Sequence, residues 1–235
     1  MSGHVIYDWC AARRLWDWKL EGRGELGVTE DGSLWIRTYD CGPGRRATNV
    51  WLKGVTLPEA FEMEWTFASE AAAGNTMVIF NAVPLGLSEV FEDPRPDALY
   101  CDLASYGKLV CHTIGFHRAV YGRPSVLRKL GGQVPAEWGQ AVYPTAAWQE
   151  MNEVTTLHST SEPLAPGERG KPHRFRLARE GRDIRFWVNG QLIHDVTDEG
   201  QYPYHTEPLV SGHMAFRNFS GFADDVYSSI VIRRL

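Results

Sequence analysis

Residues 111–130 concentrate titratable side chains, with two histidines, a tyrosine and four arginine or lysine residues in one short stretch. The guanidinium of an arginine is a planar fork of donors that matches a carboxylate, so such a cluster can hold the carboxylate of a uronic acid. A histidine or tyrosine beside the neutralised carboxylate can then move a proton, as β-elimination requires. These residue types indicate a site for an acidic sugar, and the competing interpretation is an ordinary polar strand surface.

The roles within this stretch follow from an extended backbone, in which alternate side chains lie on opposite faces. His112 then faces one side of the strand and His117 faces the other. We predict that His117 or His112 acts as the base and that Tyr121 acts as an acid or base. The basic side chains predicted to bind the substrate here are Arg118, Arg128 and Lys129.

A second polar group lies in residues 213–219, where His213 and Arg217 share one strand face and Met214 and Phe216 share the other. The apolar pair is predicted to point into the core. If this strand lies beside residues 111–130, His213 and Arg217 belong to the same substrate groove. An exposed polar face is the alternative interpretation.

Aromatic side chains supply a third group. Trp138, Tyr143 and Trp148 lie in a polar, proline-broken stretch without strand patterning, which we interpret as a loop whose rings either stack on sugars or pack the loop itself. Asn81, near a strand end, is predicted to line the same groove. The tryptophans expected in the core are Trp35, Trp51 and Trp65.

The acidic residues do not form a recognisable catalytic or metal motif. Glu62 and Glu64 sit two positions apart on one strand face, which separates them by about 6.5–7 Å, but the third acid of a laminarinase-type motif is missing. We interpret them as solvated surface charge. Asp224 and Asp225 point to opposite strand faces, so no cofactor is predicted, although a structural calcium ion is left open.

The elements that must position these residues are β-strands. Residues 61–69, 183–188 and 213–219 alternate apolar and polar side chains, and turn signals such as Asn189–Gly190 separate such runs. No long helical pattern appears. Many short alternating strands predict two packed antiparallel sheets in an all-β jelly-roll sandwich, formed as a single domain over residues 1–235.

Composition limits the partners of the chain. It has 235 residues, a formal net charge of -5 and a pI near 5.9, which argues against nucleic acid as the main partner. No apolar run reaches the length of a membrane span or a signal-peptide core, so we expect a cytoplasmic protein with reduced cysteines. A disulfide between Cys101 and Cys111, and a homodimer formed through sheet edges, are left open.

Three stretches together resemble a bacterial family of concanavalin-like jelly rolls, the YesU-like proteins: residues 16–37, residues 115–132 and residues 186–234 with their W-V-N-G and G-H-M-A-F-R-N patterns. The resemblance covers nearly the whole chain. It implies a concanavalin-like sandwich and an association with the breakdown of plant or algal polysaccharides, and it implies no catalytic residues.

Two functions follow as hypotheses. The first is an enzyme that cleaves acidic, uronate-containing oligosaccharides in a groove on one sheet, by lyase or hydrolase chemistry. The second is a lectin-like domain that uses the same groove for binding without turnover. Clustered titratable groups beside cations favour the enzyme.

Overall fold

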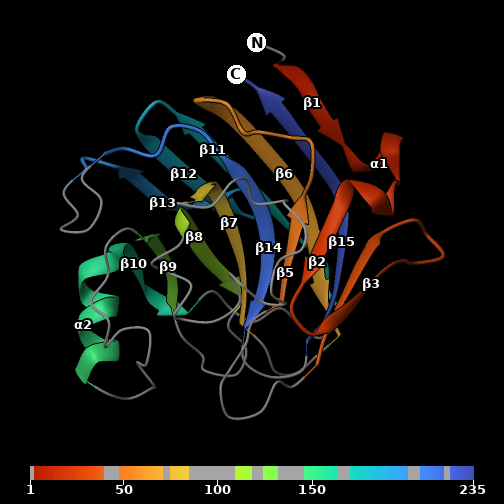
Figure 1. Cartoon of the computed structure of the whole chain (residues 1–235), viewed down its shortest axis with the longest axis horizontal. Helices are drawn as coiled ribbons and strands as arrows, with labels where there is room; N and C mark the ends of the chain where they lie inside the picture. The colour runs from red at the N-terminus through yellow and green to blue at the C-terminus, as the bar shows by residue number, and fades with distance from the viewer. Residues whose placement is uncertain are drawn as a thin grey trace.

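The computed structural model describes residues 3–39, 48–70, 75–84, 109–117, 124–131, 146–163, 170–200, 207–219 and 223–235. Within these ranges the side chains of residues 117, 124, 147–149, 151, 152, 162, 163 and 219 are left undescribed. The described part is built from two antiparallel sheets, two α-helices and one short 3-10 helix, η1 (Leu15–Asp17) (Figure 1). The sandwich predicted from the sequence is therefore confirmed.

Seven of the eight strands of the first sheet lie side by side in one continuous order, and the eighth, β1 (His4–Asp8), pairs with β15 outside that order. The order is β13 (Gln191–Thr197), β12 (Asp183–Val188), β11 (His173–Glu180), β6 (Ala60–Ser69), β15 (Ala223–Arg234), β4 (Leu34–Thr38) and β3 (Gly24–Val28).

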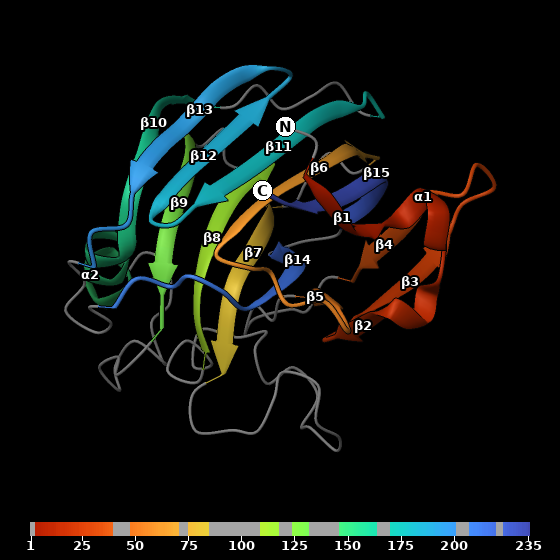
Figure 2. The same ribbon diagram turned by 90° about the horizontal axis from the view of Figure 1, so that it is seen from above.

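The seven-stranded sheet lies against it, in the order β10 (Thr156–Pro163), β9 (Pro124–Leu130), β8 (Leu109–His117), β7 (Asn75–Pro84), β14 (His213–Phe219), β5 (Thr48–Leu52) and β2 (Trp18–Glu21). Both strand orders run across the molecule from the side of α2 (Ala146–Thr155) to the side of α1 (Trp9–Ala12) (Figure 2).

Strand β6 shows why the eight-stranded sheet forms. Its side chains alternate strictly between buried and half-buried positions, so the apolar set faces the other sheet and the polar set faces outward. The neighbouring strands β11, β12 and β13 pair in sequence order as a meander. Asn189 and Gly190 have φ values of 50° and 83°, the left-handed values that the tight turn between β12 and β13 requires.

The core between the sheets is aromatic and is centred on Trp65 of β6. Its ring lies 5.4 Å from Phe175, 5.6 Å from Phe116, 5.8 Å from Phe216 and 6.1 Å from Phe186, measured between centroids. Two of these partners come from each sheet. Trp65 therefore joins the two layers, and the prediction that it fills the core is confirmed.

The seven-stranded sheet differs because its central strands, such as β5 and β7, are buried on both faces. Every side chain of β5 is buried, as are the first eight of β7. The side chains that point away from the other sheet form a second buried cluster, which contains Trp51, Ile79, Ala82, Leu109, Cys111, Leu130 and Ala215. We call the side of the seven-stranded sheet that faces away from the eight-stranded sheet its outer face.

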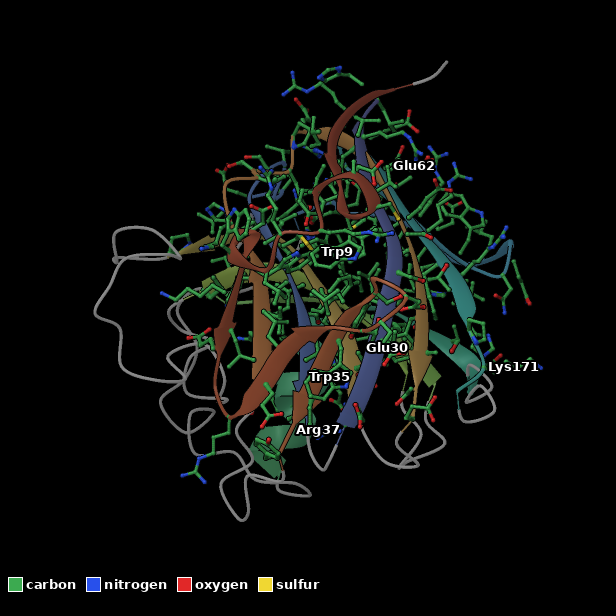
Figure 3. The ribbon with its side chains drawn as sticks, turned by 90° about the vertical axis from the view of Figure 1, so that its right-hand side faces the viewer. Trp9, Glu30, Trp35, Arg37, Glu62 and Lys171 are labelled. Atoms are coloured by element: carbon green, nitrogen blue, oxygen red, sulfur yellow. The ribbon has the colours of Figure 1, made fainter. Side chains whose placement is uncertain are left out.

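The expectation that Trp35 fills the core was wrong, whereas the burial expected of Trp51 is confirmed. Trp35 points outward from β4, half-buried, with the guanidinium of Arg37 4.7 Å from its ring centre and its indole N–H donating to Asp224 (Figure 3). Trp51 is buried, but it lies on the outer face and not between the sheets. Apolar alternation predicts burial but does not distinguish these two sides.

The helix α2 is a further correction, because the stretch that contains Trp138, Tyr143 and Trp148 was interpreted as a loop. Trp148 belongs to α2. The segment is rich in Ala, Gln, Glu and Met, which are good helix formers, so its composition carried a signal that strand patterning concealed. Among the described residues, no helix is long and apolar enough to cross a membrane.

Replacing Trp65 by alanine is predicted to destabilise the fold by about 3–5 kcal/mol, because it leaves a cavity bordered by four aromatic rings. The matched control is Trp35→Ala, which removes a ring of the same size from the outward side and is predicted to cost about 1 kcal/mol. Urea denaturation of the three proteins measures both. Equal losses for the two variants would contradict this account of the core.

Candidate functional site

The outer face of the seven-stranded sheet is organised in two rows that cross all seven strands. In the first row, strand pairing places seven residues side by side, one from each strand: Lys19, Trp51, Ala215, Ile79, Thr113, Arg128 and Thr156. The second row contains Glu21, Asn49, Arg217, Met77, Gly115, Val126 and Ser159. These rows bring together residues that are more than a hundred positions apart in the sequence.

A hydrogen-bonded cluster occupies the end of the rows formed by β2, β5 and β14. One carboxylate oxygen of Glu21 accepts from the indole N–H of Trp51 at 2.8 Å and from the amide of Asn49 at 3.3 Å. The amide oxygen of Asn49 accepts from Arg217 at 3.4 Å. Asn49 therefore connects an acid and a cation that face the same side of the sheet.

This cluster is enclosed. The exposed fractions are 8% for Glu21, 0% for Asn49, 1% for Trp51 and 3% for Arg217. Burying charged groups costs free energy that hydrogen bonds only partly recover. Apolar side chains at these positions would therefore stabilise the sheet more. A polar cluster in this position suits recognition better than packing.

The remaining part of the rows combines small side chains with two outlying cations. At the centre the small residues Ala215, Thr113 and Gly115 are interrupted by the larger Ile79 and Met77. Lys19 and Arg128 lie toward the two edges and are half-buried. The strands that carry the two cations are five positions apart in the sheet. Because neighbouring strands are about 4.8 Å apart, the distance between the two strands is about 24 Å. The face thus offers a long strip with positive charge at both ends.

The chemistry available on this strip is mainly donation to anions and hydroxyl groups. Arg217, Arg128 and Lys19 are cationic donors, and Glu21 is the one carboxylate in the two rows. Hydrolysis of a glycosidic bond by the usual route needs two carboxyl groups flanking the bond. The rows alone therefore do not supply that pair.

Three residues predicted for the groove lie on this outer face. Arg128 is in the first row and Arg217 is in the second, while His213 begins the same strand as Arg217 and is half-buried. The predicted alternation of β14 is correct, with Met214 and Phe216 in the core between the sheets. The alternative interpretation, an exposed polar face, is not met at Arg217, which is buried.

Three other predicted groove residues lie between the sheets, which corrects their assignment. His112, Lys129 and Asn81 are buried there. His112 is hydrogen-bonded to Asp198 at 3.0 Å, and the ammonium of Lys129 donates to the same carboxylate at 3.1 Å. His112 therefore points away from a substrate on the outer face.

Burial and mutual contacts shift the pKa values of the groups in this interior network. Desolvation lowers the pKa of His112 to about 4, so its ring is neutral at pH 7, and desolvation also lowers the pKa of Lys129. The hydrogen bonds and charges of His112 and Lys129 hold the pKa of Asp198 well below its usual range, against the effect of burial. The network is therefore an ion pair between Lys129 and Asp198 that His112 extends.

The other predicted residues fall where little is described. The backbone of His117 ends β8, and its side chain is not described. Tyr121, Arg118 and Trp138 lie outside the described residues, and for Trp148 the backbone alone is described. Their assigned roles stay predictions.

The sequence interpretation missed Glu21, Asn49 and Trp51. The signal was the alternation of Lys19 with Glu21 and of Asn49 with Trp51, each with apolar residues between them. Such short runs read equally well as half-exposed surface strands. Only the pairing of β2 with β5 and β14 brings these residues together with Arg217.

A chain of hydrogen bonds near the α2 side resembles an activated serine but does not act as one. The hydroxyl of Ser125 donates to the carbonyl of Gly115 at 2.7 Å, and it lies 2.8 Å from Nε2 of His194. Nε2 must therefore carry the proton, and Nδ1 of His194 accepts from Nδ1 of His158 at 2.6 Å. Because its proton is already committed to a carbonyl, Ser125 is not prepared for nucleophilic attack. The chain joins β9 and β10 to β13 instead.

The acidic pairs have structural partners. Glu62 pairs with Arg176 at 2.7 Å and Glu64 with Arg233 at 2.7 Å, on the outward side of the eight-stranded sheet. This agrees with their interpretation as surface charge. No group of three or more potential metal ligands occurs among the described residues.

Asp224 and Asp225 point to opposite sides of β15, as predicted. Asp224 pairs with Arg37 at 2.9 Å on the outward side. Asp225 is buried between the sheets, where the hydroxyl of Thr76 donates to it at 2.9 Å, and burial raises its pKa to about 7. Cys111 is a free, buried thiol, and burial raises its pKa to about 12, which disfavours the thiolate.

No protein-family model and no curated protein matches the chain. Among solved structures it is similar to a Bacillus subtilis protein of unknown function with a galectin-like fold, at 20% identity and a TM-score of 0.73, covering 100% of this chain and 97% of that one. It is also similar to the carbohydrate-binding module CBM66 from Bacillus subtilis, at 10% identity and a TM-score of 0.52, covering 92% and 95%.

A third similar structure is the exoplasmic/lumenal domain of VIP36 in its Ca2+/Man3GlcNAc-bound form, at 11% identity and a TM-score of 0.57, covering 99% of this chain and 88% of that one. At these identities the likenesses establish the fold alone. The chain has a galectin-like sandwich fold of the jelly-roll class.

The raised pKa of Asp225 makes a prediction about stability and pH. In the unfolded chain an aspartate ionises near pH 3.9, so between about pH 4 and 7 the folded protein binds the proton more tightly. Asp225 therefore makes its full contribution to the free energy of unfolding below pH 4, and this contribution is lost as the pH rises to 7.

Asp225→Asn removes this loss of stability, because an amide does not ionise. The amide oxygen can still accept the hydrogen bond from Thr76. The variant is predicted to gain stability relative to the wild type as the pH rises from 4.5 to 8, by up to about 1.4 kcal/mol for each unit of pKa shift. Urea denaturation of both proteins across this range measures the difference. A difference that does not change with pH would contradict the buried, protonated aspartate.

Proposed function

We propose that this protein binds an acidic, uronate-containing oligosaccharide along the outer face of the seven-stranded sheet. The observation that carries the proposal is the enclosed cluster in which Asn49 links Glu21 to Arg217, with the indole of Trp51 donating to the same carboxylate. Packing does not require these groups, and their cost is explained if a ligand uses them.

The types of side chain fit such a ligand. An arginine can hold a sugar carboxylate through two parallel hydrogen bonds, and Arg217 and Arg128 both lie on this face. Glu21 and Asn49 offer an acceptor and an amide to hydroxyl groups.

The solved structures give independent support. One is titled a carbohydrate-binding module and another was determined with Man3GlcNAc bound, so this fold serves carbohydrate recognition elsewhere. That support extends to the class of ligand alone. We infer that the ligand is acidic from the cations of this chain. We also propose that this chain belongs to the YesU-like family.

Cleavage of the oligosaccharide is a second candidate, and β-elimination fits this face better than hydrolysis. The rows contain cations that can neutralise a uronate carboxylate but only one acid. Of the residues predicted from the sequence to move protons, His117 is the last residue of β8, which is one of the seven strands of this sheet, and Tyr121 comes four positions later in the sequence.

Binding is tested by calorimetric titration with acidic oligosaccharides and with neutral ones of the same length. We expect Arg217→Lys to weaken binding of the acidic ligand roughly 10- to 100-fold, because lysine cannot make the bidentate contact. Arg128→Ala is expected to weaken it less. The matched control is Arg176→Ala, which removes a cation from the opposite sheet and should leave the affinity unchanged.

Preserved affinity in Arg217→Lys and Arg128→Ala, with both proteins folded, would place the ligand elsewhere. Turnover is followed separately through the ultraviolet absorbance of an unsaturated product. A product formed by addition of water, without that absorbance, would exclude β-elimination and favour hydrolysis.

A further inference from the structure

Asp225 of β15 is a buried carboxyl group between the two sheets, with an exposed fraction of 0%. One of its oxygens accepts from the hydroxyl of Thr76 at 2.9 Å. The other oxygen has no hydrogen-bond partner among the described residues. An ionised carboxylate needs donors for both of its oxygens, whereas a protonated carboxyl group does not. These contacts therefore suit the neutral form of Asp225.

The surroundings of this carboxyl group are uncharged on four sides. The described side chains that face it from the neighbouring strands do not titrate: Ile36 of β4, Ser69 of β6, Thr76 of β7 and Asn218 of β14. The titratable groups that interact with it belong to its own strand. The charge of Asp224 raises the pKa of Asp225, and the charge of Asp225 raises the pKa of Tyr227.

A second buried aspartate shows what charged partners do. The ammonium of Lys129 donates to Asp198 at 3.1 Å, and His112 is hydrogen-bonded to the same carboxylate. These groups hold the pKa of Asp198 well below its usual range. Asp198 therefore stays ionised at neutral pH. Burial instead raises the pKa of Asp225 to about 7, so this carboxyl group changes its charge near neutral pH.

Two of the contacts of Asp225 lie on strands that carry the candidate site. Asn218 directly follows Arg217 on β14, and Thr76 directly precedes Met77 on β7. Arg217 and Met77 are paired in the second row of the outer face, and Asn218 and Thr76 are paired next to them. Successive side chains of a strand point to opposite faces. Asp225 therefore lies across the sheet from the part of the row that holds Arg217.

A charge on Asp225 would act on an anion bound at Arg217. The sheet between them is packed protein, in which charges interact more strongly than they do through water. While Asp225 is protonated, the attraction between Arg217 and a sugar carboxylate is undiminished. Once Asp225 is ionised, its negative charge repels that carboxylate and weakens binding.

We propose that the proton on Asp225 regulates binding of the acidic oligosaccharide on the outer face, and that binding is accompanied by the uptake of part of a proton. This inference rests on the proposed function. The affinity is highest while Asp225 is neutral and falls as the pH rises through the range in which it ionises. By linkage, the bound ligand makes Asp225 hold its proton more tightly.

The test is calorimetric titration of the wild type with tetramers of galacturonate and of mannuronate, whose carboxylates stay ionised throughout, at about pH 5.5 and 8.5. The affinity should be roughly 3- to 10-fold weaker at the higher pH. At neutral pH the binding enthalpy should vary with the ionisation enthalpy of the buffer, which measures the proton uptake.

Equal affinity at the two pH values, without proton uptake, would overturn this inference and leave the proposed function standing. Absence of binding by either tetramer at both pH values would contradict the proposed function, and the regulation would fail with it.

Asp225→Asn is the informative variant, because an amide does not ionise and can still accept from Thr76. Its affinity should change little with pH, and binding should take up no proton. The matched control is Asp224→Asn, the same change one position away on the outward side of the eight-stranded sheet. It should keep the full pH dependence. An undiminished dependence in Asp225→Asn would assign the effect to another group, such as His213 on the strand of Arg217, and would overturn the inference.

Discussion

Burial of the seven-stranded sheet on both of its faces is the constraint on which the other features depend. A strand in such a sheet has no side that water can solvate, so each polar side chain must find a partner within the protein. On the inner side Asp198 links Lys129 and His112, and on the outer side Asn49 links Glu21 and Arg217. The candidate site and the interior network are two consequences of the same arrangement.

The eight-stranded sheet could be predicted from the sequence because one of its faces contacts water. Alternation in β6 and β12 identified the core residues Trp65 and Phe186 correctly, and the Asn189–Gly190 turn identified the meander. The alternation of β14 was also correct. Together these patterns were sufficient for the fold class.

The seven-stranded sheet carried a weaker signal, because apolar side chains on both faces remove the alternation. Trp51 and Trp35 look alike in the sequence, yet one is enclosed on the outer face and the other stacks with Arg37 on the outward side of the opposite sheet. His112 and Lys129 were assigned to the groove because type and spacing identify titratable groups but not the side of the strand that faces the core. The cluster at Glu21 depends on pairing between β2, β5 and β14, which local patterns do not specify.

The most direct test of the account is a crystal structure of the protein with an acidic oligosaccharide bound. The account predicts sugar density across the outer face of the seven-stranded sheet, with a carboxylate against Arg217 or Arg128 and hydroxyl groups near Glu21. Density on the outward side of the eight-stranded sheet, for example over Trp35, would contradict it, because the enclosed polar cluster would then have no ligand.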